Sequence, residues 1–205
     1  MKRLFLFRHG ETDANRVGIL QGHLDTRLSP LGVNQANQLS VVCKQLPIDV
    51  IHSSDLIRAK ATAAKLSQNA GRLLCYSHRL REINYGHLNG QRIDQLDDTK
   101  RQQLHQLYQQ HIPLPDPHAE TMAQLESRLV GYLDSIMDWP QHNHGIISHG
   151  QALNCLLHAL LGWPKHNMHL LQLTNCSVTE LKFTQDRWQL VRLNQDVTSI
   201  LKGIS

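Results

Sequence analysis

The stretch that decides the fold is LFLFRHGET, residues 4–12. Four consecutive apolar residues followed at once by polar residues and a glycine are typical of a buried strand that ends in a turn. In open α/β sheets, ligands bind beyond the carboxyl ends of the strands, so we expect Arg8 and His9 at the mouth of a cleft. Gly10 has no Cβ, which allows a sharp turn and the close approach of a ligand.

Strand and helix patterns alternate after this first strand. Short apolar runs predict further strands at 49–53, 73–76 and 145–148, and two closing strands at 178–183 and 188–193. Helical periodicity covers 31–46, 54–68 and 121–139, and a further helix follows residue 150. We expect Ser29 and Pro30 to begin the first of these helices, and Ser54-Asp55 to cap the second. This alternation is typical of right-handed crossovers, so the predicted fold class is α/β, a three-layer α/β/α sandwich around a mostly parallel sheet.

The segment from about 78 to 120 departs from this alternation. It contains several glycines and prolines and a glutamine-rich helical stretch at 97–110. A structureless loop of this length is unusual inside a compact domain, so we expect a helical and looped cover over the carboxyl edge of the sheet. No linker or repeat is visible, and a single domain over residues 1–205 is expected.

Composition limits the partners. The net charge is only +4 and the basic residues are scattered, which favours binding of small anions over nucleic acid. No apolar run approaches the roughly 18 residues of a membrane span, and the start of the chain is too short for a signal peptide. The four cysteines are widely spaced, which argues against a disulfide framework or a zinc site. We expect a cytoplasmic protein that does not bind membranes or nucleic acid.

Five polar residues follow predicted strands in the same way: Arg8, His9, Arg58, Glu82 and His149. Parallel strands bring their carboxyl ends to one edge of a sheet, so these side chains can converge. Guanidinium groups match phosphate oxygens with two parallel hydrogen bonds, and the set therefore predicts a pocket for a phosphate dianion. A metal site on the two histidines is disfavoured because arginines lie beside both, and no HxxxH or HExxH motif accompanies them.

A histidine can attack phosphorus when one ring nitrogen is neutral and the other is held by a hydrogen bond. His9 lies beside the turn at Gly10, whose surroundings offer a backbone carbonyl for that bond. We therefore expect a phosphohistidine on His9, with Arg8, Arg58 and His149 stabilising the charge on the phosphoryl oxygens. Glu82 is the carboxylate expected to protonate the leaving oxygen.

Several motifs together resemble the histidine phosphatase superfamily, the phosphoglycerate-mutase-like proteins. They are RHGET with Asn15, Gln21-Gly22, Leu28-Ser29, Gly32 with Gln35-Ala36, SSDLIRA at 53–59, Leu80-Arg81-Glu82 with Tyr85-Gly86, and Ser148-His149-Gly150. The likeness covers nearly the whole chain, and Asn175-Cys176-Ser177 resembles the usual ending of the family.

The resemblance implies site roles for further residues. Asn15 assists in binding the phosphate, and Gln21, Gly22 and Tyr85 contact the substrate. Two alternatives stay open, that Tyr85 only packs in the core and that Gln21 only bonds to its own loop. The resemblance implies no metal and no organic cofactor, and a small-molecule phosphate ester as the partner. A homodimer is the candidate assembly, which the sequence does not decide.

Departures from the family pattern favour hydrolysis over a mutase. Where the mutases carry a lysine, eight residues after Tyr85, this chain has Ile93, and their later tryptophan with paired arginines is missing. Ala14 stands where the family carries a tryptophan, and Ala119-Glu120-Thr121 stands where its phosphatases carry Gly-Glu-Ser. Both differences fall in the part of the site that contacts the substrate. The specific prediction is an α-ribazole 5′-phosphate phosphatase of cobalamin biosynthesis. The alternatives are a broad-specificity or sugar-phosphate phosphatase, a phosphoglycerate-type mutase, and an inactive module that binds phosphorylated ligands.

Overall fold

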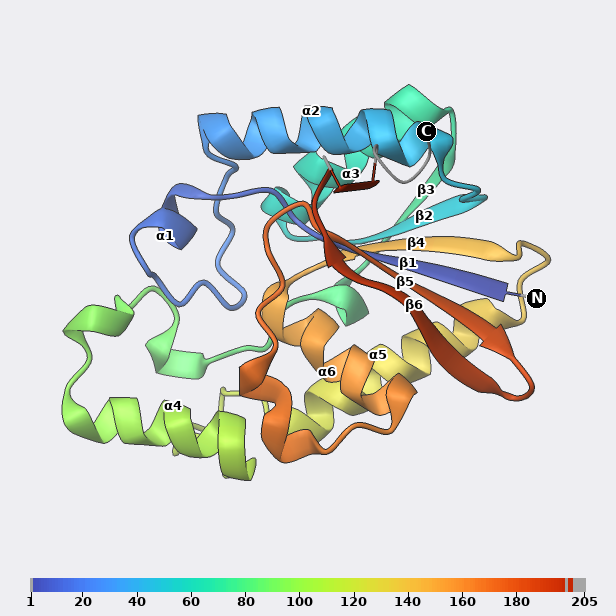
Figure 1. The fold of residues 1–205 in the computed structure, drawn as a ribbon. Coiled ribbons are helices and arrows are strands. Elements are labelled where there is room, and N and C mark those ends of the chain that lie inside the picture. The colour runs from blue at the N-terminus through green and yellow to red at the C-terminus, as the bar shows by residue number, and fades with distance from the viewer. Residues whose placement is uncertain (1, 198, 201–205) are drawn as a thin grey trace.

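The computed structural model describes residues 2–197 and 199–200, of which 167, 169 and 170 are described without their side chains. A six-stranded sheet with the order β3-β2-β4-β1-β5-β6 forms the centre of the molecule (Figure 1). The strands are β1 Lys2–Arg8, β2 Val50–Ser54, β3 Leu73–Ser77, β4 Asn143–Ser148, β5 Val178–Thr184 and β6 Arg187–Gln195. The strands β1 to β4 are parallel, and β5 and β6 pair antiparallel at one side. The predicted fold class is confirmed.

Helices cover both faces of the sheet, with α2 and α3 on one face and α5 and α6 on the other (Figure 1). The helices are α1 Asp13–Arg16, α2 Pro30–Gln45, α3 Ile57–Ala70, α4 Asp98–Gln110, α5 Met122–Met137 and α6 Gly150–Leu161. Strand β1 lies in the middle and alternates between the two cores, because successive side chains of a strand point to opposite faces. Leu4 and Leu6 pack with α5 and α6, whereas Phe5 and Phe7 pack with α2 and α3.

The helix starts agree with the sequence in one case and differ in another. Ser29 caps α2 by accepting the Gly32 N–H at 3.0 Å, as expected. The prediction that Ser54-Asp55 caps the next helix is wrong, because Ser54 is the last residue of β2 and α3 begins at Ile57. The Ile57 N–H is instead bound, at 2.8 Å, by the carboxylate of Asp25 from a distant loop.

The strand register aligns the carboxyl ends of the parallel strands. Arg8 of β1 lies opposite Ser148 of β4, and Ser54 of β2 lies opposite Ser77 of β3. The segments that follow these strands therefore begin at one edge of the sheet, toward the α1 side in Figure 1. This alignment brings the predicted site residues to one place.

The segment 78–120 covers this edge, as predicted. It contains α4 and three short 3-10 turns, His78–Leu80, Gly86–Leu88 and Ile93–Gln95. A backbone bridge between Ile19 and Arg92 ties it to the loop after β1. The four cysteines are free, and within the described part of the chain no helix is long and apolar enough to cross a bilayer. The single domain stays a prediction.

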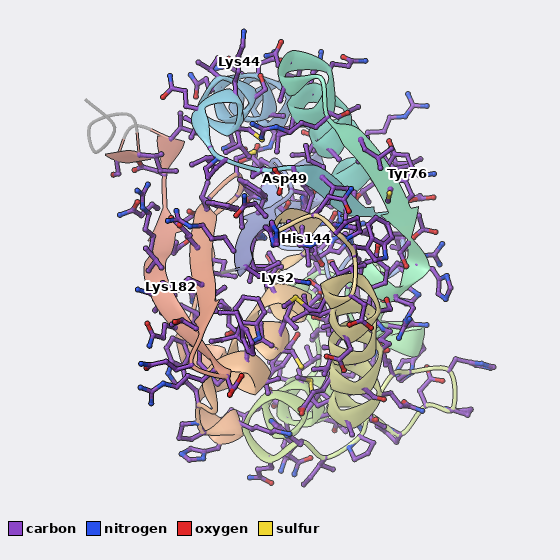
Figure 2. The ribbon with its side chains drawn as sticks, turned by 90° about the vertical axis from the view of Figure 1, so that its right-hand side faces the viewer. Lys2, Lys44, Asp49, Tyr76, His144 and Lys182 are labelled. Carbon is purple, nitrogen blue, oxygen red and sulfur yellow. The ribbon has the colours of Figure 1, made fainter. Side chains whose placement is uncertain are left out.

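A chain of buried polar side chains lies near the opposite edge of the sheet, where Figure 2 labels His144 near Lys2 and Asp49. The carbonyl of Gln141 can only accept, so His144 donates to it from Nε2, at 3.2 Å. Nδ1 of His144 then accepts from Nε2 of His52 at 3.1 Å, and Nδ1 of His52 accepts from the Tyr132 hydroxyl at 3.0 Å. Both rings are neutral in this arrangement. Burial, together with the neighbouring His144, lowers the pKa of His52 to about 3.

This pKa predicts a loss of stability in mild acid. The folded pKa of His52 lies below its ordinary value of 6.5, so the unfolded chain binds more protons as the pH falls from 6.5 toward 3. Between pH 6.5 and pH 5 the free energy of unfolding should fall by about 2 kcal/mol from this group alone. Urea unfolding at several pH values measures the loss, and His52→Gln, which cannot titrate, should show a smaller pH dependence. Equal pH dependence in both proteins would contradict the assignment.

Candidate active site

His9 lies directly after β1, and its main chain is fixed on both sides. Its N–H donates to the Ser148 carbonyl at 3.0 Å, and its carbonyl accepts from the Asn175 amide at 2.9 Å. The ring donates from Nδ1 to the carbonyl of Gly10 at 2.7 Å, because a carbonyl can only accept. The other ring nitrogen, Nε2, therefore carries the lone pair. Burial, and then the charges of two arginines, hold the pKa of His9 well below its usual value, so the ring is neutral.

Arg58 is buried at the second position of α3, with 1% of its surface exposed. Its Nε donates to Nε2 of His9 at 3.3 Å, and its two terminal nitrogens donate to the carbonyls of Gly22 and Leu24 at 2.8 and 2.7 Å. Burial lowers the pKa of Arg58 to about 10, which leaves it charged at neutral pH. Gly22 has a φ of 45°, and a Cβ at this position would collide with Asn89, so glycine is required for this carbonyl to reach Arg58.

Arg8, the last residue of β1, is the second cation. Its Nη1 donates to the Leu173 carbonyl, whereas its buried Nε has no hydrogen-bond partner among the described residues. Burial lowers the pKa of Arg8, and the negative charge of Glu82 partly offsets this effect. An unpartnered buried N–H beside His9 suits an oxygen of a bound anion.

His149 follows β4 and is fully buried next to His9, with the two ring centroids 5.1 Å apart. Nε2 of His149 lies 2.8 Å from the Ser54 hydroxyl, whose oxygen accepts the Leu56 N–H at 3.3 Å. The hydroxyl can thus donate to Nε2, which places the proton of a neutral ring on Nδ1. Burial is the main reason why the pKa of His149 is well below its usual value, and its Nδ1 has no partner among the described residues.

Glu82 supplies the carboxylate at the edge of the cleft. One oxygen accepts the N–H groups of Ile83 and Ala152 at 3.0 and 2.9 Å, and the other accepts the Gln151 N–H at 3.1 Å. Two of these donors belong to the first turn of α6, where unpaired N–H groups favour a carboxylate. The position of Glu82 is therefore set by α6, which begins directly after His149.

Arg128 on α5 fixes the backbone that carries Glu82, and its role was not predicted from the sequence. It donates to the carbonyls of Arg79, Arg81 and Glu82 at 2.7 to 2.9 Å. It also binds both carboxylate oxygens of Glu120, at 2.6 and 2.8 Å. The sequence offers one signal, the pairing of an acidic residue before a helix with an arginine two turns into it. This signal is weak because such pairs are common on exposed helices.

These side chains surround a cavity of about 400 Å³ at the carboxyl edge of the sheet. Eight of the nine predicted site residues line it: Arg8, His9, Asn15, Gln21, Gly22, Arg58, Glu82 and Tyr85. The ninth, His149, is not among the lining residues, and its ring contacts the ring of His9. Tyr85 is 4% exposed, so it is a core residue as well as a wall of the cavity, and its hydroxyl accepts from Tyr108 at 2.6 Å. Gln21 likewise lines the cavity and bonds to its own loop.

The charges of the site suit a phosphoryl group. Two guanidinium groups and two neutral imidazoles lie beside one carboxylate, so the floor of the cavity is positive and one acid–base group is available. Within the described residues, no three His, Cys, Asp or Glu side chains are placed to hold one metal ion.

Tyr108 and Gln151 also line the cavity, and no motif marked either of them in the sequence.

Comparison with known proteins identifies the class. Residues 4–196 match the histidine phosphatase superfamily, branch 1. The chain belongs to this superfamily, and the predicted resemblance to it, as well as the predicted phosphatase-type enzyme, is confirmed.

The individual relatives carry different names. The chain is 35% identical to proteins of Shigella boydii and Escherichia coli named "Probable phosphoglycerate mutase GpmB", over 92% of this chain and 88% of theirs. A mycobacterial glucosyl-3-phosphoglycerate phosphatase has a similar structure, with a TM-score of 0.85 and 30% identity, covering 96% of this chain and 100% of that one. An alpha-ribazole phosphatase from Shigella flexneri, with a TM-score of 0.83 and 24% identity over 94% of this chain and 96% of its own, shares the fold.

Arg128→Lys tests whether the hydrogen bonds of Arg128 fix the backbone that carries Glu82. A lysine keeps the charge, but its single ammonium group cannot bind one carboxylate and three carbonyls together, so we expect a loss of about 2–4 kcal/mol in the free energy of unfolding. The rate of hydrolysis of an aryl phosphate should fall about tenfold, because Glu82 loses its fixed position.

Urea unfolding and steady-state kinetics measure the two effects. Arg101→Lys is the matched control, since Arg101 also donates to backbone carbonyls but lies on exposed α4. Equal effects in both variants would contradict the role of Arg128.

Proposed function

We propose that this protein hydrolyses a small-molecule phosphate monoester through a phosphohistidine on His9. The observation that carries the proposal is the neutral ring of His9, whose Nε2 carries the lone pair. This nitrogen lies 3.3 Å from Nε of the buried Arg58. A nucleophile next to a cation is suited to attack on a dianionic phosphoryl group, because the cation offsets the repulsion of the incoming charge.

The reaction proceeds in two displacements. In the first displacement Glu82 is protonated: Nε2 of His9 attacks phosphorus in line, the bond to the ester oxygen breaks, and Glu82 gives its proton to that oxygen, so the alcohol leaves neutral and Glu82 becomes a carboxylate. Arg8, Arg58 and His149 stabilise the charge on the three phosphoryl oxygens. A water molecule then attacks the phosphohistidine and passes a proton to Glu82, which restores His9 and releases phosphate.

Hydrolysis is favoured over a mutase reaction by the walls of the cavity. A mutase must hold a second charged group while the phosphate moves, which requires additional cations. Ile93, where the mutases carry a lysine, lines the cavity instead. Relatives named as probable phosphoglycerate mutases are the reason to keep a mutase reaction as the alternative. Analysis of the products distinguishes it from hydrolysis.

The natural substrate stays a prediction. α-Ribazole 5′-phosphate, and with it a place in cobalamin biosynthesis, is the specific candidate, and a broad-specificity or sugar-phosphate phosphatase is the alternative. The cytoplasmic location, the homodimer and the independence of metal ions are predictions of the same standing. An inactive phosphate-binding module is disfavoured, because a binder does not need the carboxylate of Glu82.

His9→Ala tests the nucleophile. Hydrolysis of 4-nitrophenyl phosphate should fall on the order of a thousandfold or more, since the covalent step is lost. The wild-type rate should be unchanged in EDTA. His105→Ala, an exposed histidine of α4, is the control and should retain full activity. Retained turnover in His9→Ala would refute the assignment, and conversion of 3-phosphoglycerate to its isomer without phosphate release would show a mutase.

Glu82→Gln tests the proton donor. An alkyl ester has a poor leaving group that needs the proton, whereas 4-nitrophenol leaves as a stable anion. We therefore expect the variant to slow alkyl phosphates about a hundredfold and 4-nitrophenyl phosphate much less. The measurement is kcat/KM for both esters with the same preparation. Equal slowing of the two esters would argue against the acid role.

A further inference from the structure

We propose that the cavity selects phosphate esters of uncharged alcohols that carry further hydroxyl groups, with Gln151 as the residue that accepts a hydrogen bond from the substrate. This inference rests on the proposed phosphatase function and concerns the part of the cavity beyond the phosphate. It is carried by the side chains of the wall and by one buried oxygen atom.

Two amide side chains of the cavity lining, Asn15 and Gln21, can donate hydrogen bonds to a ligand. The side-chain oxygen of Asn15 accepts the Thr12 N–H at 3.1 Å, and the side-chain oxygen of Gln21 accepts from the Thr26 hydroxyl. The oxygen end of each amide is therefore engaged with the protein. The NH2 end is what each residue can offer to a ligand, and both residues line the cavity.

Gln151 offers the matching acceptor. It is the second residue of α6, and its backbone N–H is bonded to Glu82, which holds it beside the reacting groups. Gln151 is among the residues that line the cavity, and its buried Oε1 atom has no hydrogen-bond partner among the described residues. A buried carbonyl oxygen without a donor costs free energy, so a ligand that supplies an O–H or N–H is favoured.

A hydroxyl group fits this pair of features because it both donates and accepts. A carboxylate only accepts, so it can bind the NH2 groups of Asn15 and Gln21, but it cannot donate to Gln151 and would place its charge against that carbonyl oxygen. An alkyl chain serves neither the donors nor the acceptor. The wall thus distinguishes three classes of alcohol that carry the same phosphate.

The remaining wall suits an uncharged carbon skeleton. Ile19, Leu20 and Ile93 contribute apolar surface. Tyr85 accepts from Tyr108, so its own hydroxyl proton can be offered to a ligand, and burial keeps the pKa of Tyr85 well above its usual value. A cavity of about 400 Å³ falls in the range of small-ligand sites, which is large enough for a polyol beyond the phosphate.

Three four-carbon esters test the selection: erythritol 4-phosphate, n-butyl phosphate and 4-phosphoerythronate. All are primary phosphate esters of equal chain length, and they differ in hydroxyl groups and in one carboxylate. We expect kcat/KM for the erythritol ester to exceed that of each of the others about tenfold or more. A rate for the butyl ester or the erythronate equal to or above that of the erythritol ester would overturn the proposal.

Gln151→Met assigns the selection to one side chain. Methionine has nearly the same length and removes the side-chain amide, with its acceptor oxygen and its NH2 group, while the backbone bond to Glu82 is kept. The preference for the erythritol ester over the butyl ester should fall about tenfold, while Gln102→Met on the exposed side of α4 should keep it. Melting temperatures confirm that both variants are folded. An unchanged preference in Gln151→Met would refute the role of this residue.

The two levels of the proposal fail differently. If the protein hydrolyses aryl phosphates but none of the three esters, or shows no preference among them, the selection is wrong and the phosphatase function stands. If no phosphate ester is hydrolysed, the phosphatase function fails, and this inference fails with it.

Discussion

The hydrogen bond from Nδ1 of His9 to the carbonyl of Gly10 is the interaction on which the site depends. It places the ring proton away from the cavity, so that the lone pair on Nε2 faces Arg58. Burial and two neighbouring cations keep the ring from taking up a second proton. Because the donor and acceptor are adjacent in sequence, the bond requires a specific backbone path at Gly10. That path is held by the Gly10 N–H, which donates to the Thr62 hydroxyl of α3 at 3.0 Å.

Burying two arginines beside this ring is unfavourable unless their N–H groups are bonded. Backbone carbonyls bond part of these N–H groups, since Gly22 and Leu24 accept from Arg58 and Leu173 accepts from Arg8, whose Nε stays without a partner among the described residues. Carbonyls carry no net charge, so they satisfy the guanidinium groups without neutralising them. The cations therefore remain available to an anion. These bonds tie the loops at residues 22–24 and 173 to the two arginines.

The covering segment and the floor of the cavity are held by different means. The floor is fixed by strand register, whereas Glu82 reaches its position through Arg128 and the first turn of α6. Glu82 is thus held by α5 and by α6, and α6 begins directly after His149. Variation in the cover can change the alcohol that is accepted while the phosphate chemistry is kept, which agrees with relatives of one fold that bear the names of different substrates.

The sequence by itself determined the sheet, its parallel half and the convergence of Arg8, His9, Arg58, Glu82 and His149, because strand periodicity and the turn after each strand are local properties. Tertiary structure alone decided which groups hold these residues. The carboxylate of Asp25 accepts the first N–H of α3 although it lies 32 residues earlier in the chain. Arg128 likewise binds the Glu82 carbonyl across 46 residues of sequence. Contacts of this kind depend on the direction of side chains in a closed fold, and no spacing along the chain encodes that direction.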